Sequence, residues 1–489
     1  MGAKRGNRCV FCWLGLIAAA IWCGQAQAER VHHFTASIDP ELTQLEIKAC
    51  FDGRPPEQLV AESLDATVAL IGVWNDATGK EISPSGSIPL KSLSDNGCVT
   101  YKVNVSHPVK RHDRTGGKIR RVGADVAIST GLWLWRPESP DIDEFIELAF
   151  DLPDGIAVSV PWLQVDDADR PTFRLGQTPA DWPAWTAFGH FKVNKVDVAG
   201  SQLDIAILDG SPPVDVKQIS DWLADAAAMV GGVYGRFPYP RAQVMVVPNA
   251  RVREPAPWAF VTRGGGPAVH FVINQRRPIG EFYDDWTAAH EFSHLLLPLV
   301  DSRDAWLSEG LATYYQNVLR ARAGRLSAQQ AWLKLHAGFD RGRNEASTLT
   351  LAEATRRMYR SRLFMKVYWT GTAIMLLADV RLRQISDGSQ SLDTVLAELN
   401  DCCFEPQREW RARDLFAKLD ALTQTTVFTD LLNEYADSAQ FPDLSAAYHE
   451  LGLIPAGSRI RLVSDAPLAN LRDAIMTGKS GNMMHVSAD

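Results

Sequence analysis

The sequence predicts a multidomain protein in which a β-rich N-terminal domain precedes a mixed α/β domain and an α-helical C-terminal domain. Its 489 residues are enough for about three domains. Short hydrophobic runs separated by turn residues fill the first third of the chain, and helical periodicity dominates the second half. A composition of 46% hydrophobic and 22% charged residues is ordinary for a globular protein and excludes a disordered chain.

The first 28 residues have the pattern of an export signal. A basic start at residues 4–8 precedes an apolar run at 9–23, and Ala-Gln-Ala at 26–28 is a typical cleavage site. We therefore expect cleavage after Ala28 and a periplasmic or secreted protein. No later stretch is apolar over 18 residues, so we expect no membrane span in the mature chain.

The charge and the cysteine content limit the binding partners and the cellular compartment that we expect for the protein. The net charge of −8 makes nucleic acid an unfavourable partner, and removal of the basic signal makes the chain more acidic still. Four cysteines remain in the mature chain, at positions 50, 98, 402 and 403. Cys50 and Cys98 could pair in an oxidising compartment, whereas the adjacent pair is awkward to bridge to itself. The sequence leaves the connectivity open.

The chain divides into five consecutive segments. The signal at 1–28 precedes a β-sandwich-like domain at 29–165, with strand-like runs at 67–74 and 145–150. The α/β domain at 166–325, the helical domain at 326–455 and a C-terminal tail at 456–489 complete the chain. Within the α/β domain we expect strands at 191–198, 203–208, 244–247 and 269–273, and helices at 215–231, 282–297 and 304–323.

Residues 290–294 read His-Glu-Phe-Ser-His and fall within a predicted helix. Positions four apart on a helix lie on the same face, so His290 and His294 can present two imidazole nitrogens to one metal ion. Glu291 lies beside that face, where it can act as a general base toward water without being a ligand. This string is the strongest local signal of chemistry in the chain.

The next predicted helix carries Glu309 near its start. The gap of 14 residues after His294 allows the first helix to end and the chain to return on an antiparallel helix. A catalytic zinc ion uses three protein ligands and one open position, and two histidines with a glutamate form a known set. The spacing therefore predicts one Zn²⁺ per chain, bound by His290, His294 and Glu309.

Three local patterns together resemble the gluzincin zinc metallopeptidases, and most closely the glycyl aminopeptidase family, which is related to the aminopeptidase N family. They are residues 290–294, residues 306–315 (Trp-Leu-Ser-Glu-Gly-Leu-Ala-Thr-Tyr-Tyr) and residues 368–373 (Tyr-Trp-Thr-Gly-Thr-Ala). Weaker likeness extends over most of 30–450. The resemblance implies that the α/β domain is a thermolysin-like zinc peptidase domain.

The resemblance adds a further catalytic candidate. The aminopeptidase N family places a catalytic tyrosine before a lysine-glycine pair, and Tyr368, three positions before Gly371, matches it. A phenol can donate a hydrogen bond to the oxyanion that forms when water attacks the scissile carbonyl. The resemblance therefore implies a catalytic role for Tyr368 beside Glu291.

A peptide-binding segment is also implied by the resemblance. These families carry a glycine-rich edge strand before the zinc helix, and Gly264, Gly265 and Gly266 match it. Such a strand binds peptide through main-chain hydrogen bonds. The glutamate that holds the substrate's amino terminus in the aminopeptidase N family is absent, because Pro-Ala-Val stands at 267–269.

The predicted function is that of an exported zinc metallopeptidase that hydrolyses peptide bonds by a zinc-activated water. Family likeness favours an aminopeptidase that removes small N-terminal residues. Two alternatives remain open: a zinc endopeptidase with an open cleft, and a non-catalytic zinc-fold binding protein. Neither the peptide specificity nor the oligomeric state follows from the sequence.

Overall fold

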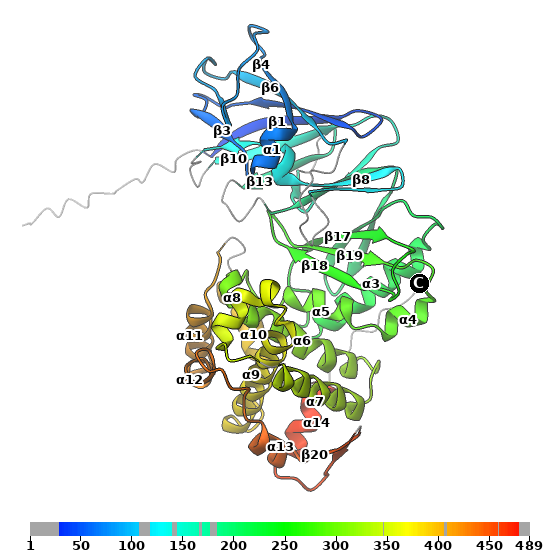
Figure 1. The fold of residues 1–489 in the computed structure, drawn as a ribbon, viewed down its shortest axis with the longest axis vertical. Coiled ribbons are helices and arrows are strands. Elements are labelled where there is room, and N and C mark those ends of the chain that lie inside the picture. Colours follow the sequence, from blue (N-terminus) through cyan, green and yellow to red (C-terminus); the bar gives the residue numbers. More distant parts are fainter. Residues whose placement is uncertain are drawn as a thin grey trace, which may run out of the picture.

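The computed structural model describes residues 29–106, 118–138, 144–165, 169–176, 183–345, 347–404, 408–457 and 459–478. The predicted signal at 1–28 lies outside these ranges. The described residues form a β-rich region, a mixed α/β region and a helical region, which follow one another along the long axis of the molecule (Figure 1). The predicted fold class is confirmed by this order.

Within the described ranges, the β-rich region contains fourteen strands and two short helices, α1 (Leu64–Ala69) and α2 (Thr130–Trp133). The strands are β1 (Arg30–Ile38), β2 (Gln44–Cys50), β3 (Gln58–Val60), β4 (Leu70–Asn75), β5 (Ser87–Pro89), β6 (Cys98–Asn104), β7 (Ile119–Val122), β8 (Asp125–Ser129), β9 (Arg136–Pro137), β10 (Glu144–Asp151), β11 (Ala157–Ser159), β12 (Leu163–Gln164), β13 (Thr172–Gly176) and β14 (Trp185–Gly189).

These strands form three sheets with orders β12-β13-β10-β1-β2-β6-β4, β11-β14-β8-β7 and β5-β3-β9. Buried and more exposed residues alternate along β1, as expected for a sheet with one face in a core. A disulfide joins Cys50 to Cys98, which lie directly opposite each other on β2 and β6. Strands β13 and β14 lie beyond the boundary predicted at residue 165, but they pair with β10 and β8, so this region continues to Gly189.

The strand predicted at 67–74 is wrong in its first part. Residues 64–69 form α1, and the strand β4 begins only at Leu70. The run of Thr, Val and Ala suggests a strand by composition. In the folded protein Ala66 and Ala69 are buried three positions apart, whereas Leu64 and Val68 are exposed, which is helical spacing. Packing of the two small alanines therefore outweighs the local β-preference.

The α/β region is built on a sheet of five described strands with three helices. Its elements are β15 (Val193–Val198), β16 (Ser201–Ile207), α3 (Val216–Gly231), β17 (Arg241–Pro248), β18 (Trp258–Thr262), β19 (Ala268–Ile273), α4 (Ile279–Asp284) and α5 (Thr287–His294). The strand order is β15-β16-β17-β19-β18. The inner strands β16, β17 and β19 are parallel, and β15 and β18 are antiparallel edges.

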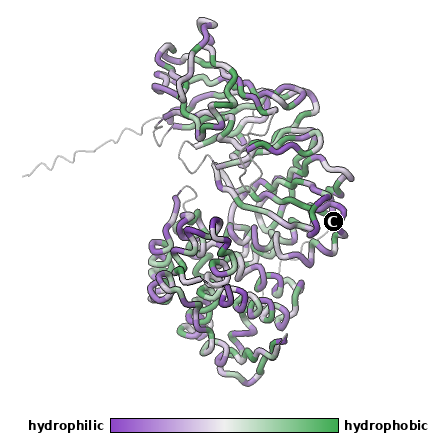
Figure 2. Tube along the Cα trace, viewed as in Figure 1, coloured by the Kyte–Doolittle hydropathy of each residue, from purple (hydrophilic) through white to green (hydrophobic). Residues whose placement is uncertain are grey.

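Both faces of this sheet are covered, which explains why β17 reads as a continuous apolar run. Val244 and Val246 point into the core formed with α3 and the helices that follow. Met245 and Val247 point into a second core shared with strands of the β-rich region. Hydrophobic residues accordingly concentrate along the central strands (Figure 2). The sheet is thus held between the β-rich region and the helices.

The single helix predicted at 282–297 is wrong, because the chain breaks between α4 and α5. Asp285 has an extended backbone, and its carboxylate accepts a hydrogen bond of 2.7 Å from the backbone N–H of Thr287. This contact satisfies one of the free donors at the start of α5. Helix α5 is buried over nearly its whole length, so tertiary packing stabilises this short helix.

The helical region begins after α5. Its elements are the 3₁₀ turn η2 (Ser302–Asp304), α6 (Ala305–Arg322), α7 (Ala328–Asn344), α8 (Leu351–Ser361), α9 (Phe364–Ile385), α10 (Leu392–Cys403), α11 (Ala412–Thr423), α12 (Val427–Tyr435), α13 (Ser445–Leu451), β20 (Leu453–Ala456), β21 (Arg459–Leu462) and α14 (Ala469–Thr477). Capping boxes at Ser327, Thr350 and Ser391 begin α7, α8 and α10. A disulfide joins Cys402 to Cys403, a pair whose bridging the sequence disfavoured.

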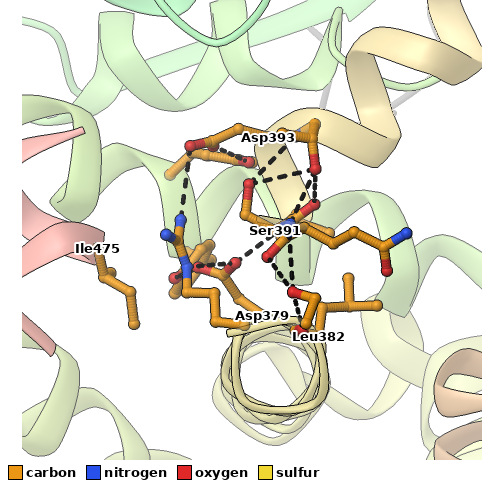
Figure 3. A network of polar contacts seen from close by, with 12 residues as sticks. Asp379, Leu382, Ser391, Asp393 and Ile475 are labelled. Atoms are coloured by element: carbon orange, nitrogen blue, oxygen red, sulfur yellow. Dashed lines mark hydrogen bonds and ion pairs between the residues drawn. The ribbon is translucent and has the colours of Figure 1, made fainter. Parts of the chain in front are cut away.

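A buried polar network links four helices of this region (Figure 3). Asp379 accepts a hydrogen bond of 2.9 Å from Nε of Arg383 on the same helix, α9. Arg322 on α6 pairs with Asp393 on α10 at 2.9 Å and donates to the carbonyl of Ile475 on α14. The predicted tail at 456–489 therefore includes folded chain up to residue 478, since α14 packs against α6. Among the described residues, no helix is long and apolar enough to cross a membrane.

Candidate metal centre

Helix α5 places His290 and His294 one turn apart on the same face. Their ring centroids are 4.8 Å apart, and the rings are nearly perpendicular. His290 is 3% exposed and His294 is partly buried. The predicted pairing of the two imidazoles therefore holds in the structure, because the short helix keeps the register that the spacing requires.

Helix α6 brings Glu309 to these histidines. Its Oε2 atom lies 3.3 Å from Nε2 of His290 and 3.6 Å from Nε2 of His294. One potential ligand atom from each of the three residues lies within 4.8 Å of the other two. The gap between His294 and Glu309 predicted that the chain returns on a second, antiparallel helix. In the structure, α5, η2 and α6 provide this return.

Two residues that sequence reasoning missed orient the imidazoles. The Nδ1 atom of His290 lies 2.8 Å from Oε1 of Gln316, and that of His294 lies 2.8 Å from Oγ of Ser308. Each contact leaves Nε2 of its histidine directed toward Glu309. Both partners are on α6, where Gln316 lies two turns after Glu309 on the same face, so helical spacing could have identified it.

The donor set fits a zinc ion. Oε2 of Glu309 is buried and makes no hydrogen bond of good geometry, so a cation is a natural partner for it. Burial lowers the pKa of His294 to about 3, which keeps its imidazole in the neutral form that coordinates metals. Two imidazole nitrogens and one carboxylate oxygen match the ligands of a catalytic zinc site with one open position.

Glu291 lies on α5 directly after His290, but it does not belong to the cluster of three potential ligands. Its side chain is buried. Burial raises the pKa of Glu291 to about 7, with a smaller contribution from the Glu309 carboxylate. The structure thus supplies a second, distinct carboxyl group at the edge of the candidate centre.

Tyr368 reaches the centre from α9. Its ring stacks on that of His290, with centroids 6.1 Å apart and planes inclined by 12°. Burial and the neighbouring Glu309 carboxylate raise the pKa of Tyr368, so the phenol stays protonated and able to donate. The approach depends on Gly310 and Gly371, since a Cβ at either position would collide with the backbone of the other helix.

The predicted glycine-rich edge strand needs correction. Residues 263–267 form a turn, and the edge strand is β18, which ends at Thr262. A Cβ on Gly264 or Gly266 would collide with the backbone of Pro183 or Pro161, and Gly265 has a positive φ of 70°. These glycines therefore allow the turn to pack closely against the β-rich region. The neighbouring Arg263 donates to the carbonyl oxygens of His294 and Leu297, so this turn supports the end of α5.

Solved structures with the same fold include proteins from Idiomarina loihiensis and Deinococcus radiodurans. An aminopeptidase N family protein from Idiomarina loihiensis superposes with a TM-score of 0.60 and 14% identity, covering 90% of this chain and 78% of the other. An M1 zinc metallopeptidase from Deinococcus radiodurans gives a TM-score of 0.53 and 15% identity, covering 85% of this chain and 95% of the other. No protein-family model and no curated protein matches the sequence. The fold is that of the gluzincin-type, aminopeptidase N-like metallopeptidases.

Proposed function

We propose that this protein is an exported zinc metallopeptidase that hydrolyses peptide bonds and removes small residues from free amino termini. The observation that carries this proposal is the convergence of His290, His294 and Glu309, whose potential ligand atoms all lie within 4.8 Å of one another. Glu291 and Tyr368 flank this cluster, on a fold shared with M1 zinc metallopeptidases. The five side chains together supply the groups that peptide hydrolysis needs.

His290, His294 and Glu309 would hold the zinc ion. When bound, zinc acts as a Lewis acid that polarises the scissile carbonyl and lowers the pKa of water at its open position. Glu291 takes a proton from the attacking water as general base and returns it to the leaving amine. Tyr368 donates a hydrogen bond to the carbonyl oxygen as negative charge develops on it.

The peptide backbone has a natural docking edge in β18. This strand pairs with β19 on one side, and among the described strands nothing pairs with its other edge. An extended peptide adds to such an edge through main-chain hydrogen bonds. Since β18 packs beside α5, a peptide bound there would run past the ligand histidines.

Structural relatives favour cleavage at the amino terminus. An M1 zinc metallopeptidase from Deinococcus radiodurans has been crystallised as a variant bound to a Tyr-Ser-Ala substrate, and two-domain M1 zinc metallopeptidase variants have been crystallised with L-arginine or L-tryptophan. A tripeptide and single amino acids are of the size that an aminopeptidase handles. The missing glutamate at residues 267–269 leaves internal cleavage by an open cleft as the alternative to test.

Export is supported by the two disulfides as well as by the signal pattern. Disulfides persist in oxidising compartments such as the periplasm or the exterior of the cell. Cys50 with Cys98 and Cys402 with Cys403 are both bonded. Mass analysis of the protein from periplasmic and culture fractions should show a chain that begins at Glu29.

A matched peptide pair tests the function and the cleavage mode together. One peptide carries a free N-terminal alanine and the other is acetylated there, and both are digested by wild type and by Glu291→Gln. We expect stepwise release from the free peptide alone, and a loss of about 10²–10⁴-fold in kcat for the variant, whose zinc content stays normal. Equal cleavage of the acetylated peptide would establish an endopeptidase. Full zinc content without cleavage of any peptide would establish the binding protein.

A further inference from the structure

Helix α8 borders the candidate metal centre. It packs against η2, against α6 and against α9, the two helices that carry Glu309 and Tyr368. It also lies at the end of the helical region that is nearest to the β-rich region (Figure 1). Side chains on the open side of α8 are therefore placed to meet a peptide that extends away from the site.

An aromatic chain connects α8 to the centre. The ring of Tyr359 on α8 contacts that of Phe364 at 5.4 Å, and Phe364 contacts Tyr368 at 6.3 Å. Tyr359 is nevertheless 63% exposed. Partial burial and the carboxylates of Glu309 and Glu291 raise the pKa of Tyr359, so this hydroxyl lies within electrostatic reach of the site. An exposed tyrosine at such a place can contact substrate.

Two exposed arginines lie to either side of Tyr359 on α8, Arg356 about 60° and Arg360 about 100° around the helix from it. Arg356 and Arg360 lie one turn apart, and both side chains are exposed. Within the described part of the chain, neither has an ion pair or a hydrogen bond from its guanidinium group. Arg357 is also exposed and unpaired there but lies about 160° further around the helix from Tyr359. The helix dipole accounts for Arg360 in the last turn but not for Arg356.

We propose that Arg356, Tyr359 and Arg360, here termed the α8 rim, bind carboxylate groups of peptide substrates on the C-terminal side of the bond that is cut. This inference rests on the proposed peptidase function. An aminopeptidase leaves one residue on the N-terminal side, so nearly all of its substrate lies on the other side. The planar guanidinium group binds a carboxylate through two parallel hydrogen bonds, and the tyrosine ring offers an apolar contact beside it.

The preferred substrate class is therefore a peptide with acidic residues shortly after its N-terminal residue, or a short peptide whose C-terminal carboxylate reaches the rim. Both sources supply the same carboxylate chemistry. In a protein with 58 acidic and 50 basic residues, such a rim also offsets the general repulsion of acidic peptides. The attraction should weaken with added salt, because exposed charges are screened.

Binding to the Glu291→Gln protein loaded with zinc tests the rim without turnover. Four fluorescent peptides separate the two sources of carboxylate: Ala-Ala-Glu-Glu and Ala-Ala-Gln-Gln, each with a free and with an amidated C-terminus. At low salt we expect each peptide with additional carboxylates to bind about 3–10-fold more tightly than the matched peptide in which those carboxylates are amides. Adding Arg356→Glu or Arg360→Glu should abolish the preference. Arg357→Glu makes the same charge change on α8 but about 160° around the helix from Tyr359, and it should retain most of the preference.

Equal affinity for acidic and neutral peptides would overturn the inference, as would equal effects of Arg356→Glu and Arg357→Glu. Wild-type kcat/KM for the same peptides separates this inference from the proposed function. Cleavage without any preference for acidic peptides would support the proposed peptidase function and contradict carboxylate binding by the α8 rim. Acidic preference in binding without cleavage by wild type would support the rim and contradict the peptidase.

Discussion

His290 and His294 each commit one ring nitrogen to α6, through Gln316 and Ser308, and direct the other toward Glu309. The ligand candidates were predictable from the sequence, because they depend on helical spacing and on one chain return. The two orienting residues were missed because Gln and Ser are common helix residues; helical spacing places Gln316 on the face of Glu309, but it does not show which side chain on that face contacts a histidine. Their role appears only when α5 and α6 lie side by side.

Loss of a histidine ligand should remove most of the metal. His294→Ala deletes one of three donors, and the remaining His290 and Glu309 form an incomplete set. We expect zinc content, measured by elemental analysis after dialysis, to fall from about one per chain to well below one. His33→Ala, which removes an exposed histidine in the β-rich region, is the matched control and should keep full zinc. Undiminished zinc in His294→Ala would contradict the assignment.

Removal of the Tyr368 hydroxyl should act on the transition state. Tyr368→Phe keeps the ring that stacks on His290 but removes the donor to the oxyanion. We expect kcat to fall by about 10²–10³-fold, the usual effect of losing one such donor, with little change in KM. Steady-state kinetics on the free alanine peptide measures both values. An unchanged kcat with a raised KM would make Tyr368 a substrate-binding residue instead.

At the scale of elements, close contact between α6 and α9 explains why the sequence patterns around Gly310 and Gly371 occur together. The two helices meet at these glycines, and the hydroxyl of Thr372 donates to the carbonyl of Gly310. This crossing brings Tyr368 to Glu309. The sequence alone marked the residues but not the reason, because a helix crossing depends on two surfaces that are distant in the chain.

At the glycine-rich turn of residues 264–266, the sequence marked the residues but suggested the wrong reason for them. Family likeness pointed to Gly264–Gly266 as a peptide-binding strand, whereas these residues pack against Pro161 and Pro183. A glycine is required wherever backbones approach closely, whether the second backbone belongs to a substrate or to another region of the same chain. The sequence contains no information that separates these two causes.

The buried network in the helical region should contribute strongly to stability. Asp379→Ala would leave the guanidinium of Arg383 and the hydroxyl of Tyr314 without their buried partner. Breaking a buried ion pair from one side costs about 3–5 kcal/mol, so we expect the urea midpoint to fall accordingly. Asp221→Ala breaks an exposed pair with Lys217 and should change stability by less than about 1 kcal/mol. Similar losses for both variants would contradict this contrast.

For the whole molecule, the order of β-rich, α/β and helical regions followed from hydrophobic periodicity, since period 2 and period 3.6 are local properties. The boundaries between these regions were harder to predict from the sequence. Strands β13 and β14 lie past residue 165 but complete sheets begun far earlier, and α14 lies in the predicted tail but packs on α6. Such pairings depend on long-range contacts that a local pattern does not encode.

Stability of the whole protein should decrease in acid, with His32 as one cause. Its side chain is fully buried, and Nδ1 accepts a hydrogen bond of 3.2 Å from the backbone N–H of Asp52. Burial lowers the pKa of His32 to about 4, assisted by the Arg30 guanidinium and opposed by Asp52. Glu144, 4.0 Å from Nε2, is already paired with Arg30.

Between about pH 6.5 and pH 4 the unfolded chain binds a proton at His32 that the folded protein does not bind. The free energy of unfolding should therefore fall as the pH drops, by up to about 3 kcal/mol from this residue. Urea unfolding at pH 7 and pH 4.5 measures the change. His32→Gln keeps an acceptor for Asp52 and should show a smaller loss, while every other titrating group affects both proteins alike. Identical losses would exclude His32 as a cause.

The placement of the site on α5, α6 and α9 also has a consequence for the order of assembly. His290, Glu291, His294 and Glu309 belong to two consecutive helices, so they meet through local contacts that close quickly and at small entropic cost. Tyr368 lies on α9, which α7 and α8 separate from α6 along the chain, so its arrival at the centre closes a longer loop. During refolding in the presence of zinc, metal uptake should therefore precede the recovery of peptide hydrolysis, and a chain arrested between the two stages would be loaded but inactive.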